Sequence, residues 1–263
     1  MAQLELNGEL ITYDETCFAI SRGLDDGILG IKYVGDGGKV PQPEGLTDYA
    51  SLFFWNTKVR ELDLTDWDTT GVKVFAFMFD SCTNLEIIKG IEKFNVSACE
   101  DFSGMFNECN HLKKLDLSAW DMSKAKSVCG MFMSCTDLVE LNVSTWRMPN
   151  CTDYDSFIDI CSSLKSLDVS NWDTTGLETM ERFACSCINL EELPLDNWNT
   201  TNLTKITGAL ANCPKLKPID FSLWDFSDFM IAKMYEHPEL KRLSVNNLIS
   251  TAEKSWMPSM SVF

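Results

Sequence analysis

Apolar side chains recur along this chain with a period close to about 26 residues, and two residue types mark the same register. Large aromatic residues occupy one position of the period: Trp67, Phe94, Trp120, Trp146, Trp172, Trp198 and Trp224. Cysteines occupy another position: Cys82, Cys109, Cys135, Cys161, Cys187 and Cys213. Two residue types that share one period indicate an internal structural repeat, and a period of roughly 20 to 50 residues is typical of a solenoid.

Each repeat combines a strand-like stretch with a helix-like stretch. Leu115 and Leu117 flank a polar residue, and such alternation is typical of a short strand. Other apolar residues of a repeat fall three or four positions apart, which predicts about two turns of helix. One such set is Val128, Met131, Phe132, Cys135 and Leu138. The copy that holds Phe94 contains one extra residue.

Repeats of this kind predict an α/β solenoid with leucine-rich-repeat architecture. We expect a right-handed coil of about eight units, with a parallel β-sheet on one face and short helices on the other. Stacking would align the aromatic residues and the cysteines in buried columns. The in-register cysteines then serve as buried thiols, while disulfides between neighbouring rungs are the alternative that a rung spacing of ~5 Å allows.

The repeat also defines the domain boundaries. It covers residues 51–250, with atypical units at both ends. Residues 1–50 do not follow the period and contain strand-like runs that are separated by turn signals such as Asn7-Gly8. We therefore predict a β-rich N-terminal cap over residues 1–50, the solenoid over residues 51–250 and a C-terminal tail over residues 251–263.

The repeat unit resembles that of the BspA-like leucine-rich-repeat family of bacterial surface antigens and lipoproteins. The resemblance rests on the segment L-D-V-S-N-W-D-T-T from Leu167 to Thr175, and on the Met-Phe pair before the cysteine, as in Met131-Phe132 before Cys135. It covers about residues 30–250. It implies the leucine-rich-repeat fold and a binding role, because members of the family are often secreted and adhere to host proteins.

The net charge of the chain limits the classes of partner that it is expected to bind. The chain has 39 acidic and 22 basic residues and a formal net charge of −17. Direct binding of nucleic acid needs a basic surface and is not expected, whereas a protein partner with a basic surface fits. No apolar stretch approaches ~20 residues, so no membrane-spanning helix is expected. The N-terminus lacks a secretory signal, which favours a cytoplasmic protein; the alternative is a secreted or cell-surface protein whose signal peptide was removed.

The sequence offers no candidate for catalysis or for metal binding. The two histidines, His111 and His237, each stand at the start of a rung without an accompanying nucleophile pattern. An aspartate follows several of the repeat tryptophans and precedes Thr or Ser, and this pattern favours local turn closure over calcium binding. The aspartates are Asp68, Asp121, Asp173 and Asp225. We expect no enzymatic activity, no metal and no cofactor.

Strand alternation predicts which side chains face outward from the sheet. An upper row of candidate binding residues consists of Glu61, Lys114, Glu140 and Glu192. A middle row consists of Asp63, Asp116, Asn142, Asp168 and Asp220. Aspartates stacked at rung spacing repel one another. Either nearby hydroxyl and amide groups satisfy their carboxylates, or the column docks the Arg and Lys side chains of a partner.

These observations predict a non-enzymatic protein–protein interaction scaffold that binds through its acidic sheet face. One form of this hypothesis is an intracellular or phage-encoded inhibitor of a basic, nucleic-acid-binding protein. The alternative is an extracellular bacterial adhesin or surface antigen whose signal peptide was removed.

Overall fold

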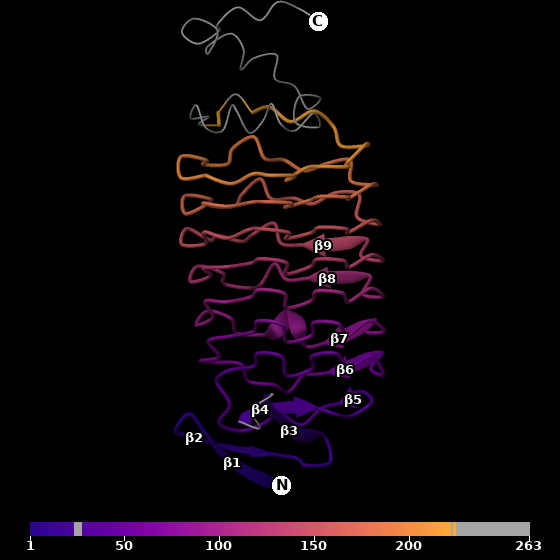
Figure 1. The fold of residues 1–263 in the computed structure, drawn as a ribbon, viewed down its shortest axis with the longest axis vertical. Helices are drawn as coiled ribbons and strands as arrows, with labels where there is room; N and C mark the ends of the chain where they lie inside the picture. Colours follow the sequence, from indigo (N-terminus) through magenta and orange to yellow (C-terminus); the bar gives the residue numbers. More distant parts are fainter. Residues whose placement is uncertain (24–27, 222, 225–263) are drawn as a thin grey trace, which may run out of the picture.

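The computed structural model describes residues 1–23, 28–221 and 223–224. Within them the chain forms coils that stack along one long axis, with the N-terminal strands at one end (Figure 1). The last repeat expected from the sequence, around Leu240, and the tail at residues 251–263 lie outside the described residues. The handedness of the coil, the total of about eight units and the domain boundaries stay predictions.

Two antiparallel hairpins begin the chain. Strand β1 (Ala2–Leu6) pairs with β2 (Glu9–Tyr13), and β3 (Phe18–Arg22) pairs with β4 (Ile28–Tyr33). Asn7 and Gly8 connect the first pair with φ values of 53° and 84°, as the Asn-Gly turn signal predicts. The β-rich character expected of residues 1–50 is therefore present. The second hairpin adjoins the first rung, because the amide of Tyr33 donates to the carbonyl of Leu52 at 2.7 Å.

Short parallel strands then line one side of the stack, at the right in Figure 1. The strands are β5 (Gly38–Lys39), β6 (Glu61–Asp63), β7 (Ile87–Lys89), β8 (Lys114–Asp116) and β9 (Glu140–Asn142). The register aligns the leucine positions of neighbouring rungs, with Leu62 opposite Ile88 and Leu115 opposite Leu141. Because these residues are buried and their neighbours in sequence are more exposed, the predicted alternation along the strands is confirmed.

The solenoid has a second parallel ladder, which the sequence did not predict. In each rung it lies a few residues after the repeat aromatic position. It consists of single bridged residues that pair with the next rung: Asp48, Val74, Asp101, Ser127, Asp153, Thr179 and Lys205. These residues share no common side-chain type. The solenoid therefore has two parallel hydrogen-bonded faces rather than one sheet and a helical layer.

The prediction of short helices on the far face is wrong. Within the described residues the structure has no α-helix, and its one 3₁₀ helix is η1 (Ile91–Lys93). Amides in residues 75–82 alternate between two kinds of partner. Those of Phe77 and Phe79 donate to the next rung, at 2.8 and 2.9 Å, whereas that of Met78 donates three residues back at 3.1 Å. The stretch is thus a series of turns that are joined to the next rung.

Left-handed residues explain why this stretch is not helical. Phe77 and Ser81 have φ values of 57° and 58°, and a pair of left-handed residues four positions apart recurs in later rungs. An α-helix needs right-handed residues throughout, with a hydrogen bond from the amide of residue i to the carbonyl of residue i−4. One left-handed residue in every four interrupts this series of bonds. Successive turns still place apolar side chains three or four positions apart, so their spacing imitates a helical stripe. None of the described helices is long and apolar enough to span a membrane.

The aromatic column is confirmed as the centre of the core. Trp146 is fully buried, and its ring stacks on those of Trp120 and Trp172 with centroids 6.4 and 5.7 Å apart. The indole N–H of Trp146 donates to the carbonyl of Leu117 in the preceding rung at 2.9 Å. The other repeat tryptophans make the same bond, so each buried indole has a hydrogen-bond partner.

The cysteine column is also confirmed. All eleven cysteines are free thiols in the structure. The Cys135 thiol is fully buried and donates to the carbonyl of Phe106 at 3.1 Å, and the other five in-register cysteines make the equivalent bond. In the first rung Asn56 replaces cysteine, and its amide donates to Gly35 of the cap at 2.9 Å.

Candidate protein-binding surface

The structure places the predicted candidate residues on one exposed face. The register pairs Lys114 with Glu140, and Asp116 with Asn142, on neighbouring rungs. All nine candidates are exposed or half-buried: Glu61, Asp63, Lys114, Asp116, Glu140, Asn142, Asp168, Glu192 and Asp220. They stand beside buried leucines at rung spacing, and so form two straight rows of side chains.

The rung that contains β7 adds two residues that sequence reasoning missed. Ile87 lies beside Glu61 in the upper row, and Lys89 lies beside Asp63 in the middle row. The extra residue of this repeat is accommodated at Gly90, which has a φ of 88° and leads into η1. A β-carbon at position 90 would clash with the backbone of Thr65, so this close approach requires glycine.

The column of aspartates is therefore not a continuous acidic stripe. Lys89 stands beside Asp63, and Asn142 and Pro194 occupy the same row further along the solenoid. Ion pairs also connect neighbouring rungs of this face. Lys114 Nζ lies 2.6 Å from Glu140 Oε1, and Lys89 and Lys217 pair with Glu61 and Glu192. The sheet face therefore carries lysines among its acidic residues.

The row aspartates also close local turns. The Oδ1 atom of Asp116 accepts bonds from the Ser118 amide at 3.1 Å and from the Ser118 hydroxyl at 2.7 Å. Asp63 and Asp168 make the same two bonds to Thr65 and Ser170. Hydrogen bonds to Thr65 and Ser118 hold the pKa values of Asp63 and Asp116 below the ordinary value. The turn-closing alternative is thus confirmed for these residues.

The aspartates that follow the repeat tryptophans are turn residues as well. Asp68, Asp121 and Asp173 each accept a bond from the backbone amide two residues ahead, at 2.9 to 3.1 Å. Asp225 lies outside the described residues. Across the part of the chain that the structure describes, no group of three or more His, Cys, Asp or Glu side chains could hold a metal ion.

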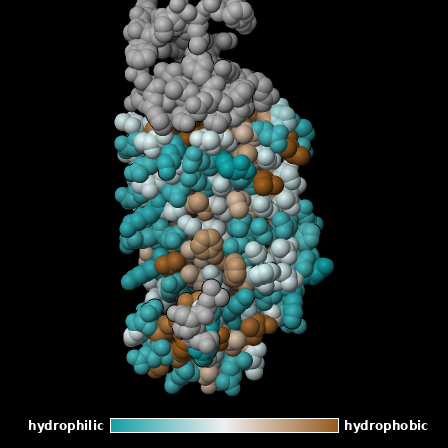
Figure 2. All heavy atoms as spheres, in the orientation of Figure 1, coloured by the Kyte–Doolittle hydropathy of each residue, from teal (hydrophilic) through white to brown (hydrophobic). Residues whose placement is uncertain are grey.

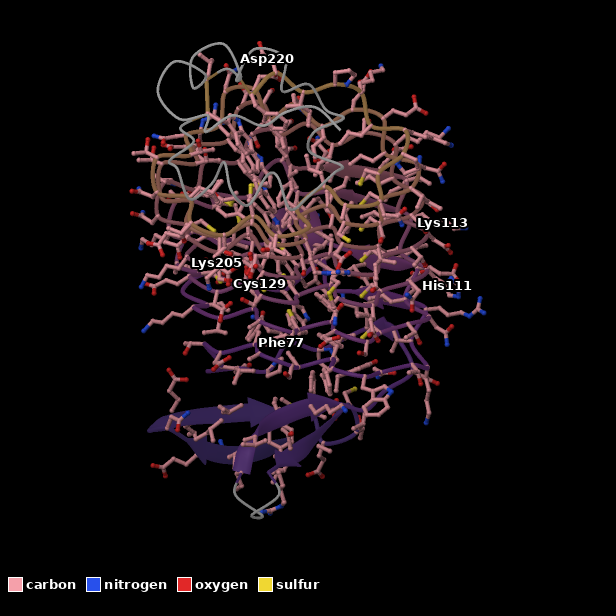
Figure 3. All side chains as sticks on the ribbon, turned by 45° about the horizontal axis from the view of Figure 1, so that its top comes forward. Phe77, His111, Lys113, Cys129, Lys205 and Asp220 are labelled. Atoms are coloured by element: carbon pink, nitrogen blue, oxygen red, sulfur yellow. The ribbon has the colours of Figure 1, made fainter. Side chains whose placement is uncertain are left out.

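His111, the histidine that lies within the described residues, pairs with one carboxylate. His111 Nδ1 lies 2.9 Å from Asp137 Oδ2 on the next rung, and both side chains are about half exposed. Figure 3 shows His111 and Lys113 at one edge of the solenoid, away from Cys129 and Lys205. His237 lies outside the described residues.

We compared the chain with models of known protein families. The family model described as "Mycoplasma protein of unknown function, DUF285" matches residues 47–167 and 136–246. The chain belongs to the DUF285 family. The two matches overlap and together span most of the solenoid, so the DUF285 repeat is the repeat described above. A search of curated proteins found no match.

Similar solved structures are bacterial leucine-rich-repeat proteins. The Treponema pallidum leucine-rich-repeat protein is 19% identical over 85% of this chain and 94% of its own, with a TM-score of 0.48. A leucine-rich-repeat protein from Bacteroides ovatus is 13% identical over 77% and 69%, with a TM-score of 0.28. A leucine-rich cell surface protein from Faecalibacterium prausnitzii is 12% identical over 84% and 96%, with a TM-score of 0.23.

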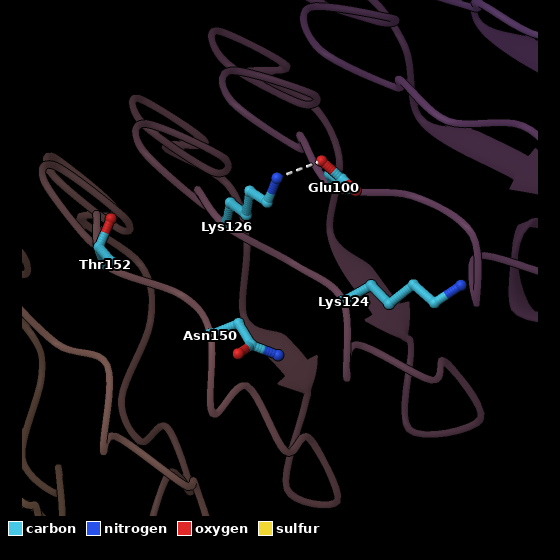
Figure 4. Close-up of a pocket in the computed structure, with 5 residues that line it drawn as sticks. All are labelled: Glu100, Lys124, Lys126, Asn150 and Thr152. Carbon is cyan, nitrogen blue, oxygen red and sulfur yellow. Dashed lines mark ion pairs between the residues drawn. The ribbon is translucent and has the colours of Figure 1, made fainter.

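The DUF285 solenoid also has a shallow depression away from the candidate rows. Its volume is about 450 Å³, and its lining residues are Glu100, Lys124, Lys126, Asn150 and Thr152 (Figure 4). These residues follow the repeat aromatic positions and lead into the second ladder. The face seen in Figure 2 is mainly hydrophilic, with hydrophobic side chains in small groups. The face in view therefore offers charged and polar contacts more than a large apolar patch.

Proposed function

We propose that this protein is a non-enzymatic protein-binding scaffold and that the parallel sheet face is its binding surface. The observation that supports this is the pair of straight rows, in which charged side chains recur at rung spacing on a ladder of short strands. An extended regular face of this kind is the surface that solenoids use for partners. The proposed contact residues are Glu61, Asp63, Lys114, Asp116, Glu140, Asn142, Asp168, Glu192 and Asp220.

Turn closure by the aspartates leaves room for a partner. The turn bonds of Asp63, Asp116 and Asp168 all use the Oδ1 atom. The Oδ2 atom of each carboxylate can therefore accept a bond from an Arg or Lys side chain of the partner. Lys89 and Lys114 lie between these acids, so the partner surface should combine a few acidic residues with a basic excess.

We also propose that the protein acts at the cell surface or outside the cell. The BspA-like repeat supports this location, because that family consists of surface antigens and lipoproteins. The inhibitor hypothesis rests on the acidic composition of the chain, and the sheet face carries Lys89, Asn142 and Pro194 among its aspartates. A surface-displayed scaffold is thus preferred over an inhibitor of a nucleic-acid-binding protein.

A pair of matched triple variants tests the binding face. The first changes Asp63, Asp116 and Asp168 to Asn. The control changes Asp68, Asp121 and Asp173 to Asn, which removes the same charge from the same kind of turn at the corner after the tryptophans. Partners are captured from a host surface-protein fraction, and their affinity for each folded variant is measured at low and moderate salt.

The sheet-face triple should weaken binding by roughly 1–3 kcal/mol, because each exposed charge contributes a modest amount. The corner triple should leave the affinity unchanged. Equal losses in both variants would mean that only overall charge or stability matters, and would remove the sheet face from the proposal.

A further inference from the structure

The first strand of the chain leaves one edge of its hairpin unpaired. Strand β2 is hydrogen-bonded on both sides, to β1 and to Glu44, because Thr12 and Glu44 exchange backbone bonds at 3.0 and 2.8 Å. Thr12 therefore occupies a non-bonded position opposite Gln3 of β1. Bonded and non-bonded pairs alternate along antiparallel strands, so the N–H and C=O groups of Gln3 and Glu5 point away from β2. Neither residue has a backbone partner on that side within the described part of the chain.

The position and the sequence of this edge leave it open to another strand. Figure 1 shows β1 at the end of the stack, next to the N-terminus. Proteins often protect a free edge with lysine, proline or a β-bulge. Strand β1 has the sequence AQLEL and an unbroken register with β2, whereas the β3–β4 hairpin has an irregularity between Ser21 and Arg22. The free edge of β1 thus lacks all of these protections.

The side chains of β1 favour pairing with a second copy of the same strand. Only one register of two antiparallel β1 strands pairs all of their residues, with Gln3 of each copy opposite Glu5 of the other. The registers shifted from it place Glu5 opposite Glu5 or Gln3 opposite Gln3 and leave strand ends unpaired. In the full register, the Gln3 amide can donate to the Glu5 carboxylate of the other copy, so the two exposed side chains complement each other.

We propose that β1 of one chain pairs antiparallel with β1 of a second copy, so that two chains join at their N-terminal ends in a twofold-symmetric dimer. Gln3 and Glu5 then exchange their free backbone bonds across the axis. On the other face of the strand, Ala2 lies opposite Leu6 and Leu4 opposite Leu4. Ala2 and Leu6 are only partly buried in one chain, and the second copy would cover them further.

The size and the charge of the contact indicate a weak dimer. Pairing would extend a two-stranded hairpin to four strands, which favours association, but the contact is small. Each chain also has a net charge of −17, so two copies repel each other at low salt. Dimerisation should therefore strengthen as salt rises, the reverse of what docking between opposite charges would show.

Removing the outward N–H tests the free edge. Gln3→Pro leaves the bonds between β1 and β2 in place and should weaken dimerisation by about tenfold, since each copy loses one N–H···O=C bond. Ile20→Pro is the matched control, because Ile20 stands in a non-bonded position opposite Ile31 in the other hairpin. It should change dimerisation by less than about twofold. Sedimentation velocity of the full chain over a wide range of concentrations measures the dimer, and the melting temperature verifies folding.

A charge swap tests the register. Gln3→Glu places two glutamates opposite each other and should weaken dimerisation by about threefold to tenfold, because like charges directly opposite repel. Adding Glu5→Gln restores one glutamine and one glutamate in each cross-strand pair, at the net charge of the wild type. This double variant should dimerise within about twofold of the wild type. An effect on the fold of the single chain would not be reversed by the second change.

Three outcomes would overturn the proposal. The chain could stay monomeric at every concentration and salt level, Gln3→Pro and Ile20→Pro could weaken the dimer equally, or the double variant could remain as weak as Gln3→Glu. The experiment needs only the purified chain and no other partner. Its failure would therefore leave the proposed sheet-face binding surface standing, and failure of the sheet-face triple would leave the dimer standing.

Discussion

Each buried indole in this solenoid joins two rungs in two ways. The Trp146 ring stacks between those of Trp120 and Trp172, and its N–H donates to the carbonyl of Leu117. A phenylalanine can replace the stacking, as Phe94 does beside Trp67, but it has no N–H to donate. Trp at this position thus adds a second bond to a carbonyl that already accepts from the Trp120 amide at 3.1 Å, and it satisfies its own buried N–H.

Replacing Trp146 by alanine should destabilise the fold by about 3–5 kcal/mol, because the change leaves a cavity in a column of stacked rings. Trp55 provides the control, since its side chain is 66% exposed and lies outside the column. Trp55→Ala should change stability by less than about 0.5 kcal/mol. Urea unfolding measures both. A loss below about 1 kcal/mol for Trp146→Ala would contradict the stacking role.

Tyr154 and Tyr49 occupy the same position in different rungs but differ in hydrogen bonding. The Tyr154 hydroxyl is fully buried beside the Cys151 thiol, which is a weak hydrogen-bond partner, whereas that of Tyr49 accepts a bond from Gln42 at 2.8 Å. Tyr154→Phe should therefore be neutral or stabilise the protein by up to about 1 kcal/mol, and Tyr49→Phe should cost about 0.5–1.5 kcal/mol. Thermal unfolding of the two variants gives the order. The reverse order would show that the bond between the Tyr154 hydroxyl and the Cys151 thiol is the stronger of the two.

At the scale of elements, the repeat period and the strand could be predicted from the sequence, but the far face could not. Apolar spacing of three or four residues fits both an α-helix and a series of turns, so Phe75, Met78, Phe79 and Cys82 do not distinguish them. The deciding feature is backbone conformation at intervening positions. Those positions carry Phe77 and Ser81 in one rung and Gly104 and Glu108 in the next, all with positive φ. Because side-chain identity varies there, the sequence gives no consistent left-handed signal.

The left-handed positions can be tested at two glycines of the same column. Gly104 and Gly130 have φ values of 61° and 59°, but only Gly104 lies directly under the Phe77 ring. Gly130→Ala should cost about 1–2 kcal/mol from the backbone alone. Gly104→Ala should cost about 1–3 kcal/mol more, because its β-carbon would meet the ring. Urea midpoints compare the two variants.

Removing the ring separates the two contributions. In a Phe77→Ala background, Gly104→Ala should cost about as much as Gly130→Ala does in the wild type. If either glycine variant leaves the midpoint unchanged, those positions do not need left-handed backbone, and a helical far face would again be possible.

At the scale of the whole molecule, the candidate face could be predicted because strand alternation fixes which residues point outward. The sequence did not reveal the middle-row position of Lys89, because the extra residue at Gly90 breaks the repeat register in that copy. Contacts between rungs of this kind depend on register rather than on any one repeat.

The cysteine columns make a prediction for the whole molecule that also bears on location. Of the eleven thiols, only those of Cys17 and Cys129 are half-buried, and the other nine are buried. Burial raises the pKa of Cys135 to about 12, and that of Cys129 to about 11. The thiolate is the reactive form, so a thiol reagent should modify at most these two residues in the folded protein. All eleven should react after unfolding in denaturant without reductant.

The outcome separates buried thiols from disulfides between rungs. Disulfides would leave fewer than eleven reactive groups in denaturant, and mass spectrometry would find linked peptides that contain Cys109, Cys135 or Cys161. The structure favours thiols, because each in-register S–H already donates to a backbone carbonyl of the preceding rung. Thiols held this way are shielded from oxidants by the core. Their survival is therefore expected inside and outside the cell alike, and free cysteines do not argue against a surface-displayed scaffold.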